Sequence, residues 1–194
     1  MNIRTKNTFQ VFLMVLSLLA LPPVEAFAEV QRKYQRSVET YAVPEVTLVD
    51  QDGKKIKLSS LLDSRDAVLL DFVFTTCTTI CPVLTSGFSS FQHRLGPEAG
   101  HVQLVSIAID PDNDTPKAMK AYIQKYGGQP GWNFLTGSRS DIVRVQKAFN
   151  TYTPDKMSHP PVILLKSRSD KGWVRIYGLI GTADLVTEYK KILR

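Results

Sequence analysis

A nearly continuous apolar run, AVLLDFVF at residues 67–74, constrains the fold of this chain more than any other feature. An apolar side chain at almost every position means that both faces of the strand are covered, whereas a strand with one wet face would alternate. The run therefore predicts the central strand of a sheet. Because two cysteines, Cys77 and Cys81, follow within eight residues of its end, any chemistry they perform takes place at the end of that strand.

The remaining pattern predicts an α/β chain of thioredoxin-like order. Residues 46–49 and 54–58 form a hairpin around the turn DQDG. After the central strand, helical and strand patterns alternate in the order helix 80–95, strand 102–109, helix 115–126, strand 132–135, helix 140–149, strands 162–165 and 173–177, and helix 182–193. We thus expect a thioredoxin-like fold, in which helices flank a central mixed β-sheet, with an N-terminal β-hairpin extension.

The first 28 residues differ from the rest. A short basic stretch precedes an apolar stretch at residues 9–21, and Ala26-Phe27-Ala28 has the small-x-small pattern of a signal peptidase site. The apolar stretch is shorter than the ~20 residues of a membrane-spanning helix, so a retained anchor is the less favoured alternative. We predict a cleavable secretory signal peptide at 1–28, a flexible lead-in at 29–41 and one domain at 42–194.

The charges of the chain exclude one class of partner. Its 24 Lys and Arg outnumber its 18 Asp and Glu, but they are scattered and form no stripe that would follow a phosphate backbone. Export also argues against nucleic acid. We expect a solvated surface, and attraction to an acidic protein face or to anionic lipid is the alternative. Membrane association is expected only if the signal peptide stays uncleaved.

Cys77 and Cys81 carry the predicted chemistry. Placed four residues apart at a helix N-terminus, their sulfurs share one face, and the exposed amides there favour the thiolate, which attacks disulfides and binds soft metals. A structural disulfide is the alternative in an exported protein. Such a short loop gains little stability from a bridge, however, because the gain grows with loop length. We therefore interpret the pair as functional.

One of the three histidines can join the cysteines. His93 lies about three helical turns beyond them, and His101 precedes a strand at the opposite edge of the sheet, so both are expected on the surface. His159 directly precedes the strand at 162–165, in a loop that faces the cysteines in a thioredoxin-like fold. Two thiolates and one imidazole suit copper, whereas zinc would want a fourth ligand.

Three motifs resemble the Sco/SenC family, which handles copper in the bacterial cell envelope and the mitochondrial inner membrane. They are DFVFTTCTTICP at 71–82, SIAIDPDNDTP at 106–116 and WNFLTG at 132–137, and the resemblance covers residues 42–194. It implies that Cys77, Cys81 and His159 bind one copper ion per monomer. It also implies a role in assembling the dinuclear copper centre of cytochrome c oxidase.

The histidine loop departs from the pattern of that family. Ser158 precedes His159 and Pro160-Pro161 follow it, where family members commonly have an acidic residue and Ser or Thr. One of the two prolines is similar in place to the cis-proline that thioredoxins keep opposite their cysteines. Met157 adds a nearby thioether, for which a packing role is favoured.

Two functions follow from these residues. The first is a periplasmic copper metallochaperone whose partners are a copper acceptor, such as an oxidase subunit, and a thiol reductant. The alternative is a thiol-disulfide oxidoreductase, in which Cys77 attacks and Cys81 resolves, keeping acceptor cysteines reduced for metallation. A location anchored to the inner membrane, facing the periplasm, is the alternative to a soluble periplasmic one.

Asp110, Asp112 and Asp114 have the alternating spacing that opens a calcium-binding loop. The sixth position lacks glycine and the twelfth is Ala121 instead of glutamate, so a calcium site is not expected. We interpret these acidic residues as negative charge placed beside the N-terminus of the helix at 115–126.

The signal peptide gives the first prediction. N-terminal sequencing of the protein from a periplasmic extract should begin at Glu29, because cleavage follows Ala28. Recovery of the uncut chain in membranes alone would contradict it.

Overall fold

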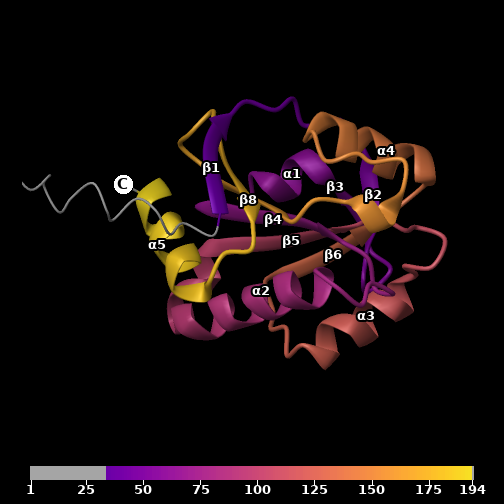
Figure 1. Cartoon of the computed structure of the whole chain (residues 1–194), viewed down its shortest axis with the longest axis horizontal. Coiled ribbons are helices and arrows are strands. Elements are labelled where there is room, and N and C mark those ends of the chain that lie inside the picture. Colours follow the sequence, from indigo (N-terminus) through magenta and orange to yellow (C-terminus); the bar gives the residue numbers. More distant parts are fainter. Residues whose placement is uncertain (1–33, 194) are drawn as a thin grey trace, which may run out of the picture. The chain divides into compact units, whose positions relative to one another are not determined.

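The computed structural model describes residues 34–193, and the predicted signal peptide and residues 29–33 of the lead-in lie outside this range. Its strands form one eight-stranded sheet in the order β1-β8-β7-β4-β5-β6-β2-β3 (Figure 1). The strands are β1 (Tyr34–Glu39), β2 (Thr47–Asp50), β3 (Lys55–Lys57), β4 (Ala67–Val73), β5 (Val102–Ala108), β6 (Trp132–Thr136), β7 (Val162–Ser167) and β8 (Trp173–Gly178).

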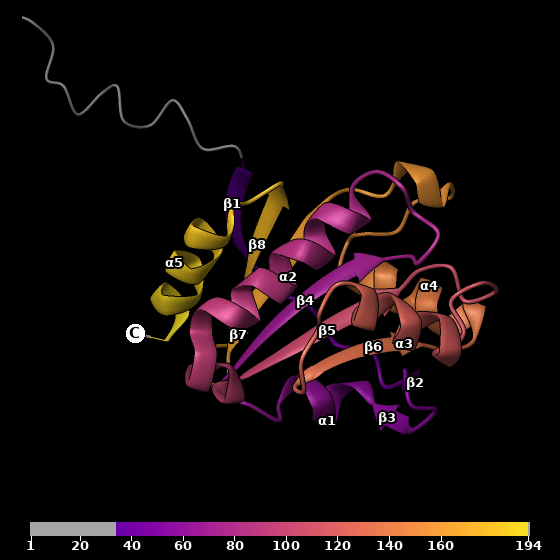
Figure 2. The same ribbon diagram turned by 90° about the horizontal axis from the view of Figure 1, so that it is seen from below.

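Helices cover both faces of this sheet. Figures 1 and 2 show α2 and α3 on one side of β4, β5 and β6, and α1 and α4 on the other, while α5 packs beside α2. The helices are α1 (Leu58–Leu62), α2 (Cys81–Leu95), α3 (Pro116–Lys125), α4 (Arg139–Ala148) and α5 (Thr182–Ile192), with 3-10 turns η2 (Gly96–His101) and η3 (Lys156–Ser158). No described helix has both the length and the apolar character needed to cross a membrane.

Strand β4 lies at the centre of the sheet, as its apolar run predicts. All seven of its residues are buried. It pairs with β5 in parallel (Leu70 opposite Val105) and with β7 antiparallel (Leu70 opposite Leu164). Full burial of an apolar side chain such as that of Leu70 stabilises the fold by about 1.5–3 kcal/mol relative to leaving it in water. The mixed pairing places the ends of β4 and β5 and the start of β7 at one edge of the sheet.

The structure confirms the mixed sheet, its flanking helices and the N-terminal hairpin, which is formed by β2 and β3. It differs from the sequence prediction at the flexible lead-in, because Tyr34–Glu39 forms β1 and pairs antiparallel with β8. The four central residues of β1 are exposed, so the strand shows no apolar alternation for sequence reasoning to detect. Backbone pairing and the Arg36 ion pair to Glu188 hold it instead.

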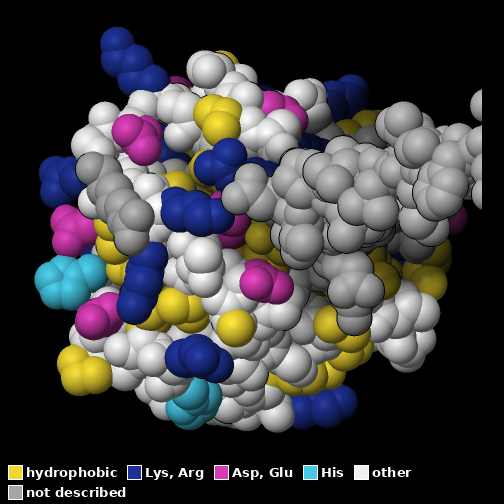
Figure 3. Space-filling model, turned by 60° about the vertical axis from the view of Figure 1, so that its left-hand side comes forward, with side chains coloured by type: hydrophobic (Ala, Val, Ile, Leu, Met, Phe, Trp, Pro, Cys, Tyr) yellow, Lys and Arg dark blue, Asp and Glu magenta, His cyan; other side chains and the backbone are white. Residues whose placement is uncertain are grey.

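Charges of both signs are mixed on the face of the molecule drawn in Figure 3, where Lys and Arg side chains lie among Asp and Glu. The lysines and arginines seen on this face are scattered, as the sequence predicts.

Candidate metal centre

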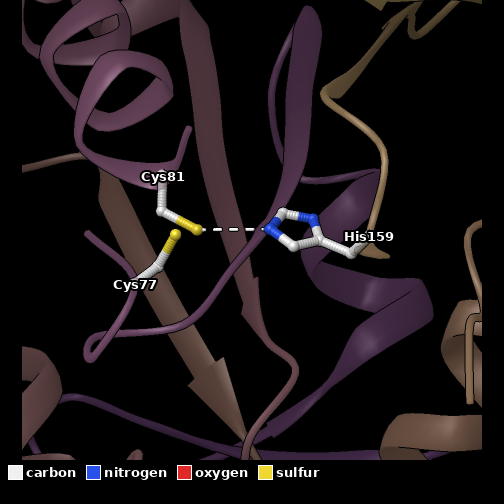
Figure 4. Close-up of side chains that lie close together, drawn as sticks. All are labelled: Cys77, Cys81 and His159. Carbon is white, nitrogen blue, oxygen red and sulfur yellow. Dashed lines mark hydrogen bonds between the residues drawn. The ribbon is translucent and has the colours of Figure 1, made fainter. Parts of the chain in front are cut away.

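The cysteines lie where β4 passes into α2. Cys77 is in the connecting loop, held by a hydrogen bond from its backbone N–H to the carbonyl of Phe74 (3.1 Å), and Cys81 is the first residue of the helix. Pro82 follows at the next position, where its missing N–H costs no helical hydrogen bond. The sequence predicts that both cysteines share one face at the N-terminus of a helix. The helix begins only at Cys81, yet the loop turns Cys77 toward it (Figure 4). Both cysteines are free and buried.

His159 reaches the cysteines from across the site. It lies between η3 and β7, and its imidazole Nε2 is 3.3 Å from the sulfur of Cys81 (Figure 4). The ring packs edge-on against Phe74, with 5.6 Å between centroids, and only 5% of the residue is exposed. One ligand atom from each of Cys77, Cys81 and His159 lies within 4.8 Å of the other two. The three predicted residues are therefore brought together.

The other two histidines lie away from this cluster, on the surface. His93 is exposed on α2, and exposed His101 pairs through Nδ1 with Asp66 (2.9 Å). Met157 is 57% exposed, so the packing role favoured from the sequence is wrong. All described peptide bonds are trans, so neither Pro160 nor Pro161 is the cis-proline suggested by the position of these residues in the sequence.

The two thiols differ in acidity. Burial opposes ionisation of Cys77, but hydrogen bonds from the Thr79 hydroxyl and from the backbone of Cys81 and Thr79 outweigh it and lower its pKa to about 7. For Cys81, which is fully buried, burial raises the pKa above the usual range of a thiol, and negative charge on Cys77 acts in the same direction. Cys77 is thus the nucleophilic member of the pair, and Cys81 is the member that gains most from a cation.

The imidazole is held in its metal-binding form. Burial lowers the pKa of His159 below its usual value, and the backbone of Pro160 opposes this effect in part. Two thiolates are soft donors of the kind that selects copper, and a neutral imidazole nitrogen also suits that metal. A buried cation would also compensate the charge that burial makes unfavourable on the cysteines. The donor set therefore fits a single copper ion.

A further ionisable group lies close enough to Cys81 to affect it, and the sequence gives no signal for it. Asp71 on β4 is fully buried, and in the described part of the chain neither carboxyl oxygen accepts a hydrogen bond. Burial raises its pKa to about 7, and the nearby hydroxyl of Ser106, on the paired strand β5, acts in the opposite direction without meeting the geometry of a hydrogen bond. The negative charge of Asp71 raises the pKa of Cys81 in turn.

The acidic residues after β5 make a contact that the sequence does not predict. Thr115 caps α3 by accepting from the N–H of Ala118 (3.2 Å). Asp114, which is fully buried, instead accepts from the backbone N–H and the hydroxyl of Thr75, at 2.9 and 2.6 Å. This contact spans 39 residues, so no local pattern could have indicated it.

Known proteins match both the sequence and the fold. A family model described as SCO1/SenC matches residues 35–188. Over 104 residues the chain is 40% identical to the SCO1 protein homolog of Bacillus subtilis, covering 53% of each protein, so it spans about half the length of the curated relatives it matches.

Two solved structures extend this match. One is BsSco, described as a member of the Sco family of cytochrome c oxidase assembly proteins, with a TM-score of 0.66, 30% identity and coverage of 79% of this chain and 94% of BsSco. The other is Bradyrhizobium japonicum ScoI with copper bound, with a TM-score of 0.64, 26% identity and coverage of 78% and 99%. These neighbours confirm the thioredoxin-like fold.

Asp71 gives the prediction of this subsection. Because its folded-state pKa of about 7 lies above the 3.8 of an ordinary aspartate, the folded protein holds a proton that the unfolded chain loses between those values. This group therefore lowers stability progressively as pH rises across that window. Urea unfolding of the reduced, metal-free protein should show that the free energy of unfolding of Asp71→Asn, relative to wild type, increases by up to about 4 kcal/mol as pH rises from about 4 to 7.5. The exposed Asp170→Asn is the control, and a gain independent of pH would contradict the prediction.

Proposed function

The chain belongs to the SCO1/SenC family, and from that membership we propose that it is a copper-binding metallochaperone of the periplasm. The convergence of Cys77, Cys81 and His159 within 4.8 Å carries this proposal. Copper is the cargo in this function. The buried donors hold it away from water and from adventitious ligands until an acceptor arrives.

The three donors suggest how copper leaves the site. His159 is a neutral ligand, whereas Cys77 and Cys81 bind as anions from the loop after β4 and from the start of α2. An incoming thiolate from an acceptor can replace the imidazole first, because the neutral imidazole leaves the copper ion without separating opposite charges, whereas a departing thiolate would separate them. The two cysteines then leave in turn as further acceptor ligands bind. No electron is transferred, and the released cysteines take up protons.

We propose an oxidase subunit as the acceptor. The described role of BsSco in cytochrome c oxidase assembly and the copper held by Bradyrhizobium japonicum ScoI support this choice. A thiol reductant is the second partner, because a Cys77–Cys81 disulfide would leave no thiolate to bind copper and would need two electrons and two protons to reopen. The periplasmic location rests on the predicted signal peptide, with anchoring to the inner membrane as its alternative.

The unequal acidity of the two thiols favours a second candidate function, that of a thiol-disulfide oxidoreductase. With a pKa of about 7, a large share of Cys77 is thiolate at neutral pH, and this thiolate can attack an acceptor disulfide, forming a mixed disulfide. Cys81 then attacks the sulfur of Cys77, which forms the Cys77–Cys81 bond and releases the acceptor as a dithiol. The acceptor gains two electrons, and the cysteine pair loses them.

Stoichiometry tests the metal site directly. Reduced protein should bind one Cu(I) per monomer in competition with a chelator, because the described chain has one cluster of soft donors. Cys77→Ser or Cys81→Ser should each abolish tight binding, since the hydroxyl is a poor ligand for this soft ion. His101→Ala is the matched control and should bind like wild type. Tight one-to-one binding by either serine variant would overturn the site.

His159→Ala separates the two functions. As a metallochaperone, the variant should lose copper affinity by about 100-fold, since removing even an outer partner of a ligand costs 10–100-fold. Its disulfide should still form and reduce at the wild-type rate. As an oxidoreductase alone, it should keep copper affinity and change the pKa of Cys77 and the rate of thiol exchange. Titration with a Cu(I) chelator and stopped-flow exchange on the same protein distinguish these outcomes.

A further inference from the structure

We propose that Lys156 and Asp110 position His159, through a turn at residues 110–114 that joins the cysteine loop to the histidine loop. We name these residues the acidic turn. The inference rests on the proposed function, in which His159 is a copper ligand. It gives the acidic turn, which supplies none of the three proposed ligands, a function at the metal site.

The acidic turn is a rigid unit. The carbonyl of Asp110 accepts from the backbone N–H of Asn113 (3.0 Å) and of Asp114 (2.8 Å). The Asp110 carboxylate accepts from the amide of Asn113 at 2.8 Å, and the N–H of Asp110 donates to the Asp114 carboxylate at 3.2 Å. Asp110 is 5% exposed and Asp114 is fully buried. Side chains that leave this turn therefore start from fixed positions.

One side chain of the acidic turn fixes the cysteine loop. The Asp114 carboxylate accepts hydrogen bonds from the backbone N–H and the hydroxyl of Thr75. Thr75 lies in the loop after β4, two residues before Cys77. The turn is tied to the same strand by the hydrogen bond from the N–H of Ile109 to the carbonyl of Val73 (2.9 Å). The acidic turn and the cysteine loop thus form one body.

The other side chain reaches the histidine loop. The Asp110 carboxylate accepts from the ammonium of Lys156 at 2.5 Å, across 46 residues of sequence. The same ammonium lies 5.3 Å from the ring centroid of Phe74, whose ring packs against His159. The carbonyl of Lys156 accepts from the N–H of His159 at 3.3 Å. Lys156 therefore contacts the acidic turn, the aromatic ring behind the histidine and the histidine backbone.

The histidine loop is anchored on both sides of the ligand. After His159, the carbonyl of Pro161 accepts from the N–H of Gly178 at 2.9 Å, which fixes the loop to the end of β8. Before His159, the hydrogen bonds of η3 stay within the loop, from Ser158 and Met157 to Asp155. The Lys156–Asp110 pair is the upstream tie to the body that carries the cysteines. Breaking it should let the imidazole move away from the Cys81 sulfur, while the loop that carries Cys77 stays in place.

Another lysine of this chain offers a matched control. Lys166 pairs with Asp63 at 3.2 Å and lies 5.7 Å from the ring centroid of Trp173, so it makes the same two kinds of contact as Lys156. It stands opposite Val68 near the start of β4, at the far end of the strand from the site. Lys166→Met should therefore lose similar contacts with no effect on the histidine.

The experiment measures Cu(I) affinity and the position of His159 separately. Lys156→Met should weaken copper binding by about tenfold, in the range found when the outer partner of a ligand is removed. Lys156→Arg should restore it to within about threefold, because it keeps the charge. Asp110→Asn should match Lys156→Met, and the double variant should be no weaker than either single one, since both break the same pair. The Lys166→Met control should bind like wild type.

A metal-free readout keeps the test independent of copper. In the reduced protein, nuclear Overhauser contacts between the rings of His159 and Phe74 should weaken in Lys156→Met and persist in Lys166→Met. Alkylation of Cys77 should proceed at the wild-type rate in both, because Asp114 still holds Thr75. Intact ring contacts in Lys156→Met would overturn the proposal. If His159→Ala leaves copper affinity unchanged, the proposed function fails, and the ring contacts still decide the role of Lys156.

Discussion

The site depends on the pairing of β4 with a parallel strand on one side and an antiparallel strand on the other. This pairing brings three chain segments, the cysteine loop, the acidic turn and the histidine loop, to one edge of the sheet. Contacts of 39, 46 and 78 residues in sequence separation then form among them. Because β4 is buried along its whole length, the packed core holds these three segments in place whether or not a metal is bound.

Burial also determines the chemistry at that edge. It raises the pKa of Cys81 and of Asp71 and lowers the pKa of His159, so each buried group is pushed toward its neutral form. Cys77 escapes this effect because hydrogen bonds at the start of α2 stabilise its thiolate. A cation bound between the donors would favour both thiolates at once. The same environment can therefore serve metal binding and, when metal is absent, thiol exchange with Cys77 as the attacking group.

Local patterns in the sequence predict most of the fold and indicate Cys77, Cys81 and His159 as the proposed ligands. The apolar run of β4, the proline after Cys81 and the polar loop before β7 each leave a signal within a few residues. The polar strand β1 leaves none, because it is held by pairing with β8 instead of by burial. The ties made by Asp114 and Lys156 also leave none, since they join residues far apart in the chain and involve side chains that are common on any surface.

The ligand set of the bound metal is the central claim, and X-ray absorption at the copper edge tests it most directly. Spectra of the reduced protein loaded with one equivalent of Cu(I) should fit two sulfur ligands and one imidazole nitrogen. In His159→Ala, the nitrogen contribution should disappear while both sulfurs remain. A wild-type spectrum fitted by sulfur alone, or a nitrogen contribution that survives in His159→Ala, would contradict the assignment of His159 as the third ligand.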